Sequence, residues 1–290
     1  MMNRRHHLLV SLLILIVVGS ASTAWAESPY HSHEEINSRL HKLASVYPSA
    51  TVKRIGKSSQ GREILALEID TDGKLDRTDP VLLLHGGIHG NEWISVEVVL
   101  HLAEFALASH AQLGTLRIHF VPVVNVDGFA ARRRKAVDRA GHWYDPNRDF
   151  PVPRETKPHK SRALVSALRR YAKRGKLVGV LDYHAPAECI MWPWAFSKSQ
   201  EPPGVEALKV VVEKMARSVG YCFGQTSKII SYRHKATAQD YFANVHGAAA
   251  VLMELGHLRG AETDFAPQEL VEQERPFSIF LRWLIKRNAN

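Results

Sequence analysis

Cysteine is scarce in this chain, which has only Cys189 and Cys222 among its 290 residues. Two cysteines are too few for a disulfide-rich scaffold or for a structural zinc site built from four thiolates. An even number suits a bridge in an exported protein but does not require one. A single disulfide and two separate buried thiols therefore both remain open.

Long apolar runs are also missing. The apolar stretch near the N-terminus, residues 8–18, is about half of the ~20 residues that a membrane-spanning helix needs. Arg4 and Arg5 precede it and Ala24-Trp25-Ala26 follows it, which is the pattern of a secretory signal with its cleavage site. The sequence predicts a signal peptide over residues 1–26, export to the periplasm or the medium, and no permanent membrane span after cleavage.

Repeats, low-complexity tracts and a Gly/Ser/Pro-rich linker are absent after residue 26. The composition, 45% hydrophobic and 23% charged, is that of a folded domain and excludes a disordered or fibrous chain. We therefore expect residues 27–290 to form a single domain.

Acidic residues are outnumbered by basic ones, and the formal net charge is +9. Residues 1–26 contribute two of the 38 Lys and Arg and none of the 29 acids, which leaves +7 after cleavage. A basic protein is attracted to anionic polymers. Export favours acidic lipid or cell-wall glycan over nucleic acid, so no nucleic-acid partner is expected.

Short apolar runs rich in Val, Leu and Ile alternate with amphipathic segments along the chain. This alternation predicts an α/β fold, a three-layer α/β/α sandwich around a mixed, mostly parallel sheet. The expected strands are residues 51–55, 63–70, 81–84, 116–124, 177–181 and 248–255, and the expected helices are 33–46, 91–109, 161–173, 205–219 and 267–286.

Three His-x-x-Glu pairs occur, and only their context separates them. They are His31/Glu34, His101/Glu104 and His89/Glu92. The first lies in a polar stretch and the second in an amphipathic helical pattern, so both are interpreted as surface pairs. The third follows the buried strand 81–84 through a glycine-rich turn and precedes a helix, which is where open α/β sheets bind ligands.

A catalytic zinc needs three protein ligands and an open position for water. His184 ends another buried strand and so can reach the same sheet edge as His89 and Glu92. Glu254 ends the last expected strand, where a carboxylate is costly unless it faces a polar cleft or pairs with an Arg. The basic run 132–135 is interpreted as a set of solvent-exposed side chains, of which one could point inward and stabilise a developing oxyanion.

Five segments, in order, resemble the motifs of the zinc metallocarboxypeptidase family. They correspond to the first metal motif, the Asn-Pro-Asp-Gly turn with Val126 in place of proline, the terminal-carboxylate segment, the strand of the third ligand, and the strand of the base. The segments are residues 86–93 (GGIHGNEW), 125–129 (NVDGF), 145–151 (DPNRDFP), 181–184 (LDYH) and 253–256 (MELG). The resemblance covers nearly all of residues 27–290 and implies a carboxypeptidase-like fold with one catalytic domain.

The resemblance implies that His89, Glu92 and His184 bind one Zn²⁺ per chain. Glu254 would take a proton from the attacking water and pass it to the leaving amine. Arg134 best matches the arginine that polarises the scissile carbonyl, with Arg132 and Arg133 as close competitors.

The resemblance also implies how a peptide would be held. Asn147 and Arg148 would bind its terminal carboxylate, Arg148 through a bidentate pair that Lys cannot copy. Asp145 would orient the first metal-binding histidine, and Tyr232 would close over the substrate. By loose alignment, Gln239 lies near the floor of the side-chain pocket, where a neutral amide argues against a strictly basic or strictly apolar preference.

These implications favour a secreted zinc carboxypeptidase that acts on peptides with a free C-terminal carboxylate. Only residues 27–88 separate the expected cleavage site from His89, so we expect no inhibitory pro-segment, as in relatives that process bacterial cell-wall peptides. Peptidoglycan stem peptides and ordinary L-peptides are equally weighted as substrates. The alternatives are an N-acyl amino acid deacylase of the aspartoacylase and succinylglutamate desuccinylase type, and a non-catalytic cell-wall-binding protein.

Overall fold

The computed structural model describes residues 30–70, 78–109, 116–152, 161–230, 234–256 and 267–288. The predicted signal peptide, residues 1–26, and the candidate lid residue Tyr232 lie outside these described residues. Among the described helices, none combines the length and the apolar character needed to cross a bilayer.

An eight-stranded mixed sheet forms the centre of the molecule, in the order β1-β2-β4-β3-β7-β10-β8-β9. The contacts between β4, β3, β7 and β10 are parallel, as is the β8–β9 pair, whereas β1–β2, β2–β4 and β10–β8 are antiparallel. The strands are β1 Ala50–Lys57, β2 Glu63–Ile69, β3 Pro80–His85, β4 Arg117–Val121, β7 Lys176–His184, β8 Cys189–Trp192, β9 Cys222–Gln225 and β10 Ala249–Glu254. A separate small hairpin pairs β5 Ala136–Val137 with β6 Trp143–Tyr144.

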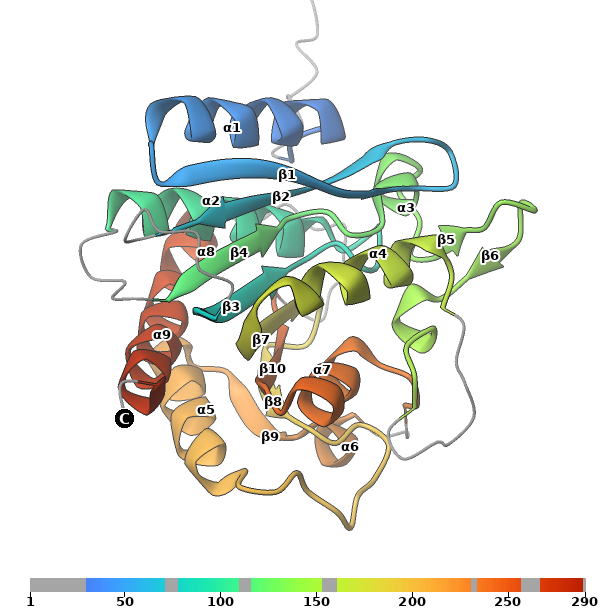
Figure 1. The fold of residues 1–290 in the computed structure, drawn as a ribbon. Helices are drawn as coiled ribbons and strands as arrows, with labels where there is room; N and C mark the ends of the chain where they lie inside the picture. Colours follow the sequence, from blue (N-terminus) through green and yellow to red (C-terminus); the bar gives the residue numbers. More distant parts are fainter. Residues whose placement is uncertain are drawn as a thin grey trace, which may run out of the picture.

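Helices cover both faces of the sheet, as Figure 1 shows. In that view α4 and α7 lie in front of the sheet, α2 lies behind it, and α1 follows the β1 edge. Helix α5 packs on α9 and on β8 and β9. The described helices are α1 His33–Val46, α2 Trp93–Ala108, α3 Val126–Ala130, η2 Pro146–Arg148, α4 Ala163–Tyr171, η3 Ala172–Arg174, α5 Glu206–Val219, α6 Thr226–Ile229, α7 Ala238–His246, α8 Pro267–Glu272 and α9 Glu274–Asn288.

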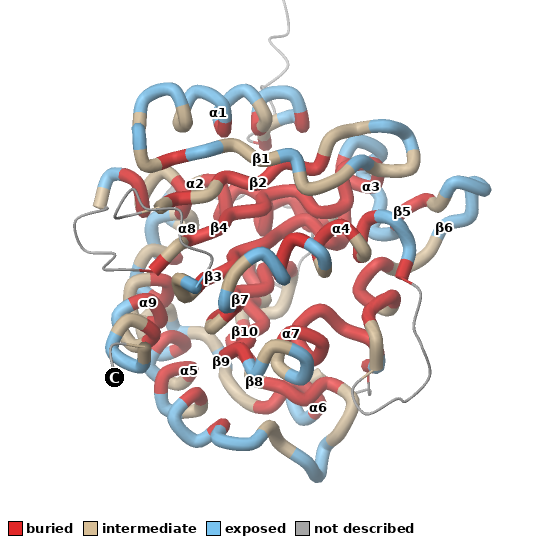
Figure 2. The backbone as a smooth tube through the Cα atoms, in the orientation of Figure 1, coloured by how far each residue is buried: buried red, intermediate tan, exposed pale blue. Residues whose placement is uncertain are grey.

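The buried residues run through the sheet and the inner sides of its helices (Figure 2). The central strands are buried on both faces, which explains their continuous apolar runs. Helix α1 begins at a capping box in which Ser32 and Glu35 satisfy each other's backbone N–H groups. The expected α/β sandwich with a mixed sheet is thus confirmed.

Several short elements have no counterpart among the expected ones. Strands β8 and β9 have four residues each, which is too short for a period-two pattern. Helix α7 begins immediately after its N-cap residue Thr237, which ends a polar segment. The helix expected over residues 267–286 is divided at Gln273 into α8 and α9. These differences do not move the strand ends that carry the candidate site residues.

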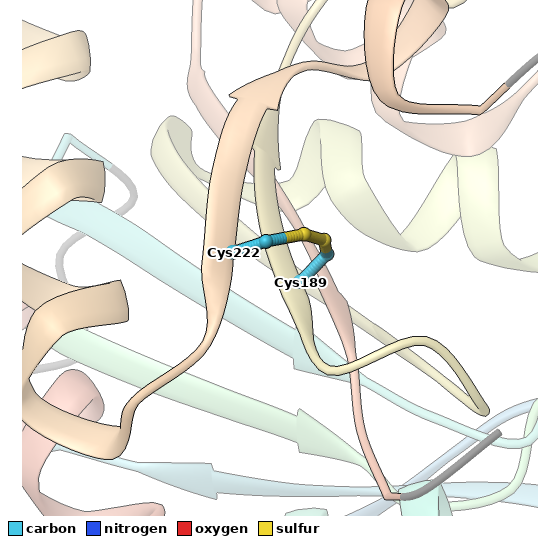
Figure 3. The surroundings of a disulfide bond; sticks show 2 residues. All are labelled: Cys189 and Cys222. Atoms are coloured by element: carbon cyan, nitrogen blue, oxygen red, sulfur yellow. A yellow bond between two sulfur atoms is a disulfide. The ribbon is translucent and has the colours of Figure 1, made fainter.

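A disulfide joins Cys189 to Cys222, which decides between the two alternatives left open by the sequence (Figure 3). The two cysteines are register partners on the parallel strands β8 and β9, with Cα atoms 4.4 Å apart. Their sequence separation is 33 residues, and closing a loop of that size stabilises a fold by about 3–4 kcal/mol in the chain-entropy account. The bond holds edge strand β9 onto β8, which in turn pairs with β10, where Glu254 lies opposite Cys189.

Candidate metal centre and substrate cavity

Polar side chains gather where three neighbouring parallel strands end. His89 and Glu92 follow β3, and His184 and Glu254 are the last residues of β7 and β10. In the sheet order β3 lies beside β7 and β7 beside β10, and His184 is the register partner of Glu254. The carboxyl ends of parallel strands meet at one edge, which is why residues distant in sequence converge here.

The turn after β3 depends on glycine at one position in particular. A Cβ on Gly90 would lie 2.1 Å from the carbonyl carbon of Gly128, so the two turns could not approach as they do. The Asn125 side chain caps the second turn by accepting from Gly128 N at 2.9 Å. Both Gly90 N and Asn125 Nδ2 donate to the Arg134 carbonyl, each at 3.3 Å. The close packing of these turns therefore fixes the backbone of Arg134 beside the first metal motif.

His89, Glu92 and His184 present ligand atoms that all lie within 4.8 Å of one another, and all three residues are buried. His89 Nδ1 is 2.8 Å from Glu92 Oε1, His184 Nδ1 is 2.9 Å from Glu92 Oε2, and the two Nδ1 atoms are 3.1 Å apart. Two ring nitrogens and a carboxylate that converge in this way form a donor set for a cation. Two histidines and one glutamate fit zinc with an open position. In the described part of the chain, no other cluster of this kind is found.

The charge state of Glu92 suits this role. Burial alone would raise the pKa of Glu92, but the adjoining His89 and His184 hold it below its ordinary value. The carboxyl is therefore ionised at neutral pH and available as a ligand.

Each candidate histidine ligand has a carboxylate behind it. Asp145 Oδ1 lies 3.1 Å from His89 Nε2 and also accepts from Asn147 N at 2.9 Å, which fixes its position. Asp182 Oδ1 lies 3.0 Å from His184 Nε2, and His85 Nδ1 lies 3.4 Å from the same oxygen. Such contacts orient metal-binding rings and raise their basicity. Sequence reasoning missed Asp182 and His85, although Asp182 stands two residues before His184 on the same strand.

The three arginines of the basic run point to different places. Arg134 donates to Glu92 Oε1 at 3.0 Å and to Asp145 Oδ2 at 3.3 Å, and it lines the cavity described below. Arg132 stacks on the ring of Trp93, 4.4 Å from its centroid, and Arg133 on the ring of Trp143 at 4.9 Å. Among the competitors for the oxyanion role, Arg134 is the one that the structure places at the site.

The segment expected to hold a terminal carboxylate forms the short helix η2. Asn147 Oδ1 accepts from Ala238 N at 2.8 Å, and its Nδ2 lies 3.3 Å from His184 Nε2. The Arg148 guanidinium donates through Nη1 to the Asn147 carbonyl at 2.6 Å and through Nη2 to His234 Nδ1. His234 was not singled out from the sequence, because it stands in a short polar stretch without periodicity.

Glu254 lies at the end of β10, half-buried at the wall of the cavity. Burial raises the pKa of Glu254 to about 7, with Glu92 adding to the shift and His184 opposing it. A carboxyl that titrates near neutral pH can both accept and return a proton in one catalytic cycle.

One cavity of about 250 Å³ brings these groups together. Gln239 lies at its wall with the amide fully buried, accepting from Thr226 Oγ1 at 2.8 Å and donating to the Met191 carbonyl at 2.9 Å. A larger cavity of about 630 Å³ lies beside α1 and contains none of the candidate metal ligands. The smaller cavity is lined by His89, Glu92, Arg134, Asn147, Arg148, Asp182, His184, Ala185, Pro186, Ala187, Ala195, Thr226, Ile230, His234, Thr237, Gln239, Leu252 and Glu254.

Comparison with known proteins agrees with this geometry. A profile of the zinc carboxypeptidase family matches residues 36–273. The inactive metallocarboxypeptidase ecm14 of Schizosaccharomyces pombe is 26% identical over 217 residues, which cover 61% of this chain and 44% of that relative. The chain spans about half of the length of the curated relatives that it matches.

Solved structures with the same fold include carboxypeptidase A from Helicoverpa armigera, with a TM-score of 0.78 and 22% identity over 90% of this chain and 75% of that chain. The murein-tripeptide amidase MpaA from Escherichia coli O157 has a TM-score of 0.50 and 18% identity over 81% of this chain and 91% of that chain. The family profile covers well over half of the sequence, and the sheet edge carries a donor set that fits zinc. The chain therefore belongs to the zinc carboxypeptidase family.

Proposed function

We propose that the chain is an exported, zinc-dependent carboxypeptidase that hydrolyses the C-terminal peptide bond of its substrate. The observation that carries the proposal is the cavity in which the donor set of His89, Glu92 and His184 shares one space with Arg148 and Glu254. A binding protein has no need of Glu254 beside a metal donor set. Because the family also includes a relative described as inactive, activity has to be tested directly.

The charged and metal-binding residues of the cavity each have a chemical role in this proposal. His89, Glu92 and His184 would hold a zinc ion, which would supply Lewis acidity to the scissile carbonyl and to a water. Arg148, with Asn147 beside it, binds the terminal carboxylate and so places the last peptide bond in the cavity. Arg134 stabilises negative charge that develops on the carbonyl oxygen. Glu254 takes a proton from the attacking water and passes it to the departing amine.

A free terminal carboxylate is expected to be required for efficient cleavage, because Arg148 is the cation that would bind it. Amidation of that carboxylate should lower kcat/KM by roughly 10²-fold, the scale of a lost charge-assisted pair in a cavity. The measurement compares the hydrolysis of one acylated dipeptide as the free acid and as the amide. Equal cleavage of both would contradict exopeptidase action, whereas cleavage of an N-acyl amino acid in preference to the dipeptide would support a deacylase.

We propose further that the physiological substrate is the stem peptide of peptidoglycan. The net charge of +7 after the predicted cleavage would concentrate the enzyme on an anionic wall. One protein of the same fold, MpaA, is a murein-tripeptide amidase. Gln239 at the cavity wall is neutral and provides no charge that would select a basic terminal side chain.

Purified muropeptides should lose a terminal residue when they are incubated with the enzyme, as detected by mass spectrometry. Raising the salt concentration should slow the digestion of intact wall more than that of soluble fragments, because long-range attraction is screened. A panel of ordinary L-peptides is digested in parallel. If only the L-peptides are shortened, the wall proposal fails and a general carboxypeptidase remains.

A further inference from the structure

His234 lies beside Arg148 in the substrate cavity, on a segment that no motif of the sequence marks. Its side chain is buried, and it lines the cavity together with Arg148 and Arg134. Its ring Nδ1 receives a hydrogen bond from Nη2 of the Arg148 guanidinium. His234 therefore touches the group proposed to bind the substrate carboxylate, through the terminal nitrogen that does not bond the Asn147 carbonyl.

The backbone of His234 is anchored by a distant part of the chain. His234 N donates to the Ala195 carbonyl at 3.2 Å, and the buried Asp240 carboxylate accepts from Ala195 N and Phe196 N at 3.0–3.2 Å. Asp240 belongs to α7, so the helix fixes the 195–196 loop and the loop fixes His234. This arrangement supports His234 from outside the carboxylate-binding segment.

The segment that carries His234 also contacts the carboxylate-binding segment through its backbone. Phe150 N donates to the Ala236 carbonyl at 3.2 Å, and Ala238 N donates to Asn147 Oδ1 at 2.8 Å. Residues 234–238 thus meet residues 147–150 at three points, one of which is the His234–Arg148 contact. The guanidinium is bonded at both terminal nitrogens, Nη1 by the Asn147 carbonyl and Nη2 by His234.

The chemistry of the ring suits an acceptor. Burial, with Arg148 and Arg134 adding to the shift, lowers the pKa of His234 to about 4. The neutral ring offers a lone pair at one nitrogen, whereas a protonated ring would repel the guanidinium. An arginine whose guanidinium is already held in one orientation loses less conformational entropy when it binds a carboxylate, and this preorganisation favours binding.

We infer that His234 is a positioning residue that holds Arg148 for the terminal carboxylate and thereby sets the preference for free over blocked C-termini. This role rests on the proposed function, in which Arg148 binds the terminal carboxylate of the substrate. His234 would act through Arg148 and would not touch the reacting atoms.

The test compares the two amide side chains, Asn and Gln, which differ in length by one methylene. In His234→Asn the amide oxygen can take the place of Nδ1 and still accept from Arg148, whereas in His234→Gln it falls nearer the position of Nε2. His234→Ala and His234→Gln should raise KM for the free-acid dipeptide by about 10-fold, the scale of one hydrogen bond to a charged group, with kcat little changed. His234→Asn should keep a KM near that of the native enzyme, and cleavage of the amidated dipeptide should be the same in all variants.

Two further variants separate positioning from general damage. His119, equally buried but on β4 against the ring of Tyr171, provides the matched control, and His119→Gln should leave KM unchanged. In an Arg148→Ala background, His234→Ala should cause no additional loss, because it acts only through Arg148.

The possible failures can be told apart. If the native enzyme cleaves free and amidated substrates equally, the proposed function fails. If it prefers the free acid but Asn, Gln and Ala at position 234 behave alike, or if His234→Ala still raises KM without Arg148, the inference is overturned and the proposed function stands. Should the Ala variant fail to fold, the Asn and Gln pair alone decides the question.

Discussion

The substitution Glu254→Gln is expected to lower kcat by at least about 10²-fold, the usual scale for a lost general base, while the protein keeps its zinc. The reason is geometric: Glu254 shares the cavity with the donor set and is the register partner of His184, but it is not one of the three converging ligands. Glutamine preserves the size of the side chain and removes its ability to take a proton. The measurement pairs steady-state kinetics with metal analysis of the same preparation.

The pH profile gives this prediction a second readout. The base must be ionised, and burial raises the pKa of Glu254 to about 7. Activity should therefore rise with pH through an acidic limb at or below pH 7, since a neighbouring cation lowers a carboxyl pKa. The limb should be absent from the residual activity of Glu254→Gln.

Glu201 offers a control acid. It binds Lys209 and Trp192 and does not line the cavity, so Glu201→Gln should retain native activity. Native kcat in Glu254→Gln would refute the assignment of the base. Loss of zinc together with activity would mean that Glu254 supports the metal instead.

The substitution His184→Ala should abolish both zinc binding and hydrolysis. It removes one of three ligands from a buried site, so the loss of affinity should exceed the 10–100-fold that is typical when only an outer partner of a ligand is changed. The native protein should contain about one zinc per chain, lose activity with a chelator and regain it with Zn²⁺ or Co²⁺. Elemental analysis after gel filtration, combined with hydrolysis of the free-acid dipeptide, measures both effects.

His101 is the matched control for this experiment. It belongs to another His-x-x-Glu pair in the sequence, but the structure places its Nε2 2.8 Å from Glu274 on α9, outside the cavity. His101→Ala should keep both zinc and activity. Full hydrolysis by metal-free His184→Ala would exclude zinc from the reaction.

The elements that carry the site were predictable because they depend on local patterns. Continuous apolar runs identified β3, β7 and β10 as buried strands. A polar residue at the carboxyl end of a buried parallel strand lies at the edge of the sheet, where ligands bind. For the same reason His89, His184 and Glu254 could be expected to meet. The zinc carboxypeptidase fold and family are confirmed, whereas the catalytic roles of these residues stay predictions.

Other features could not be read from local patterns. Strands β8 and β9 were missed because four residues carry little periodic signal, and their pairing in the sheet brought Cys189 and Cys222 together. Helix α7 also went unrecognised, although it holds the loop that supports His234. These elements owe their conformation to their neighbours more than to their own sequence.

By itself, the sequence determined the periodicity of the main strands and helices and the residue types at the strand ends, since apolar spacing and turn chemistry act within a few residues. Only the tertiary structure decided which member of the basic run enters the cavity, because the packed turns at Gly90 and Asn125 orient Arg134 while Arg132 stacks on Trp93. It also decided that His85 of β3 joins His184 at the Asp182 carboxylate and that His234 holds Arg148. Asp182 and His184 are near neighbours on one strand, but the contact with His85 depends on the pairing of β3 with β7. The contacts of Arg134 and His234 join segments far apart in the chain, so they depend on how those segments pack and not on any local pattern.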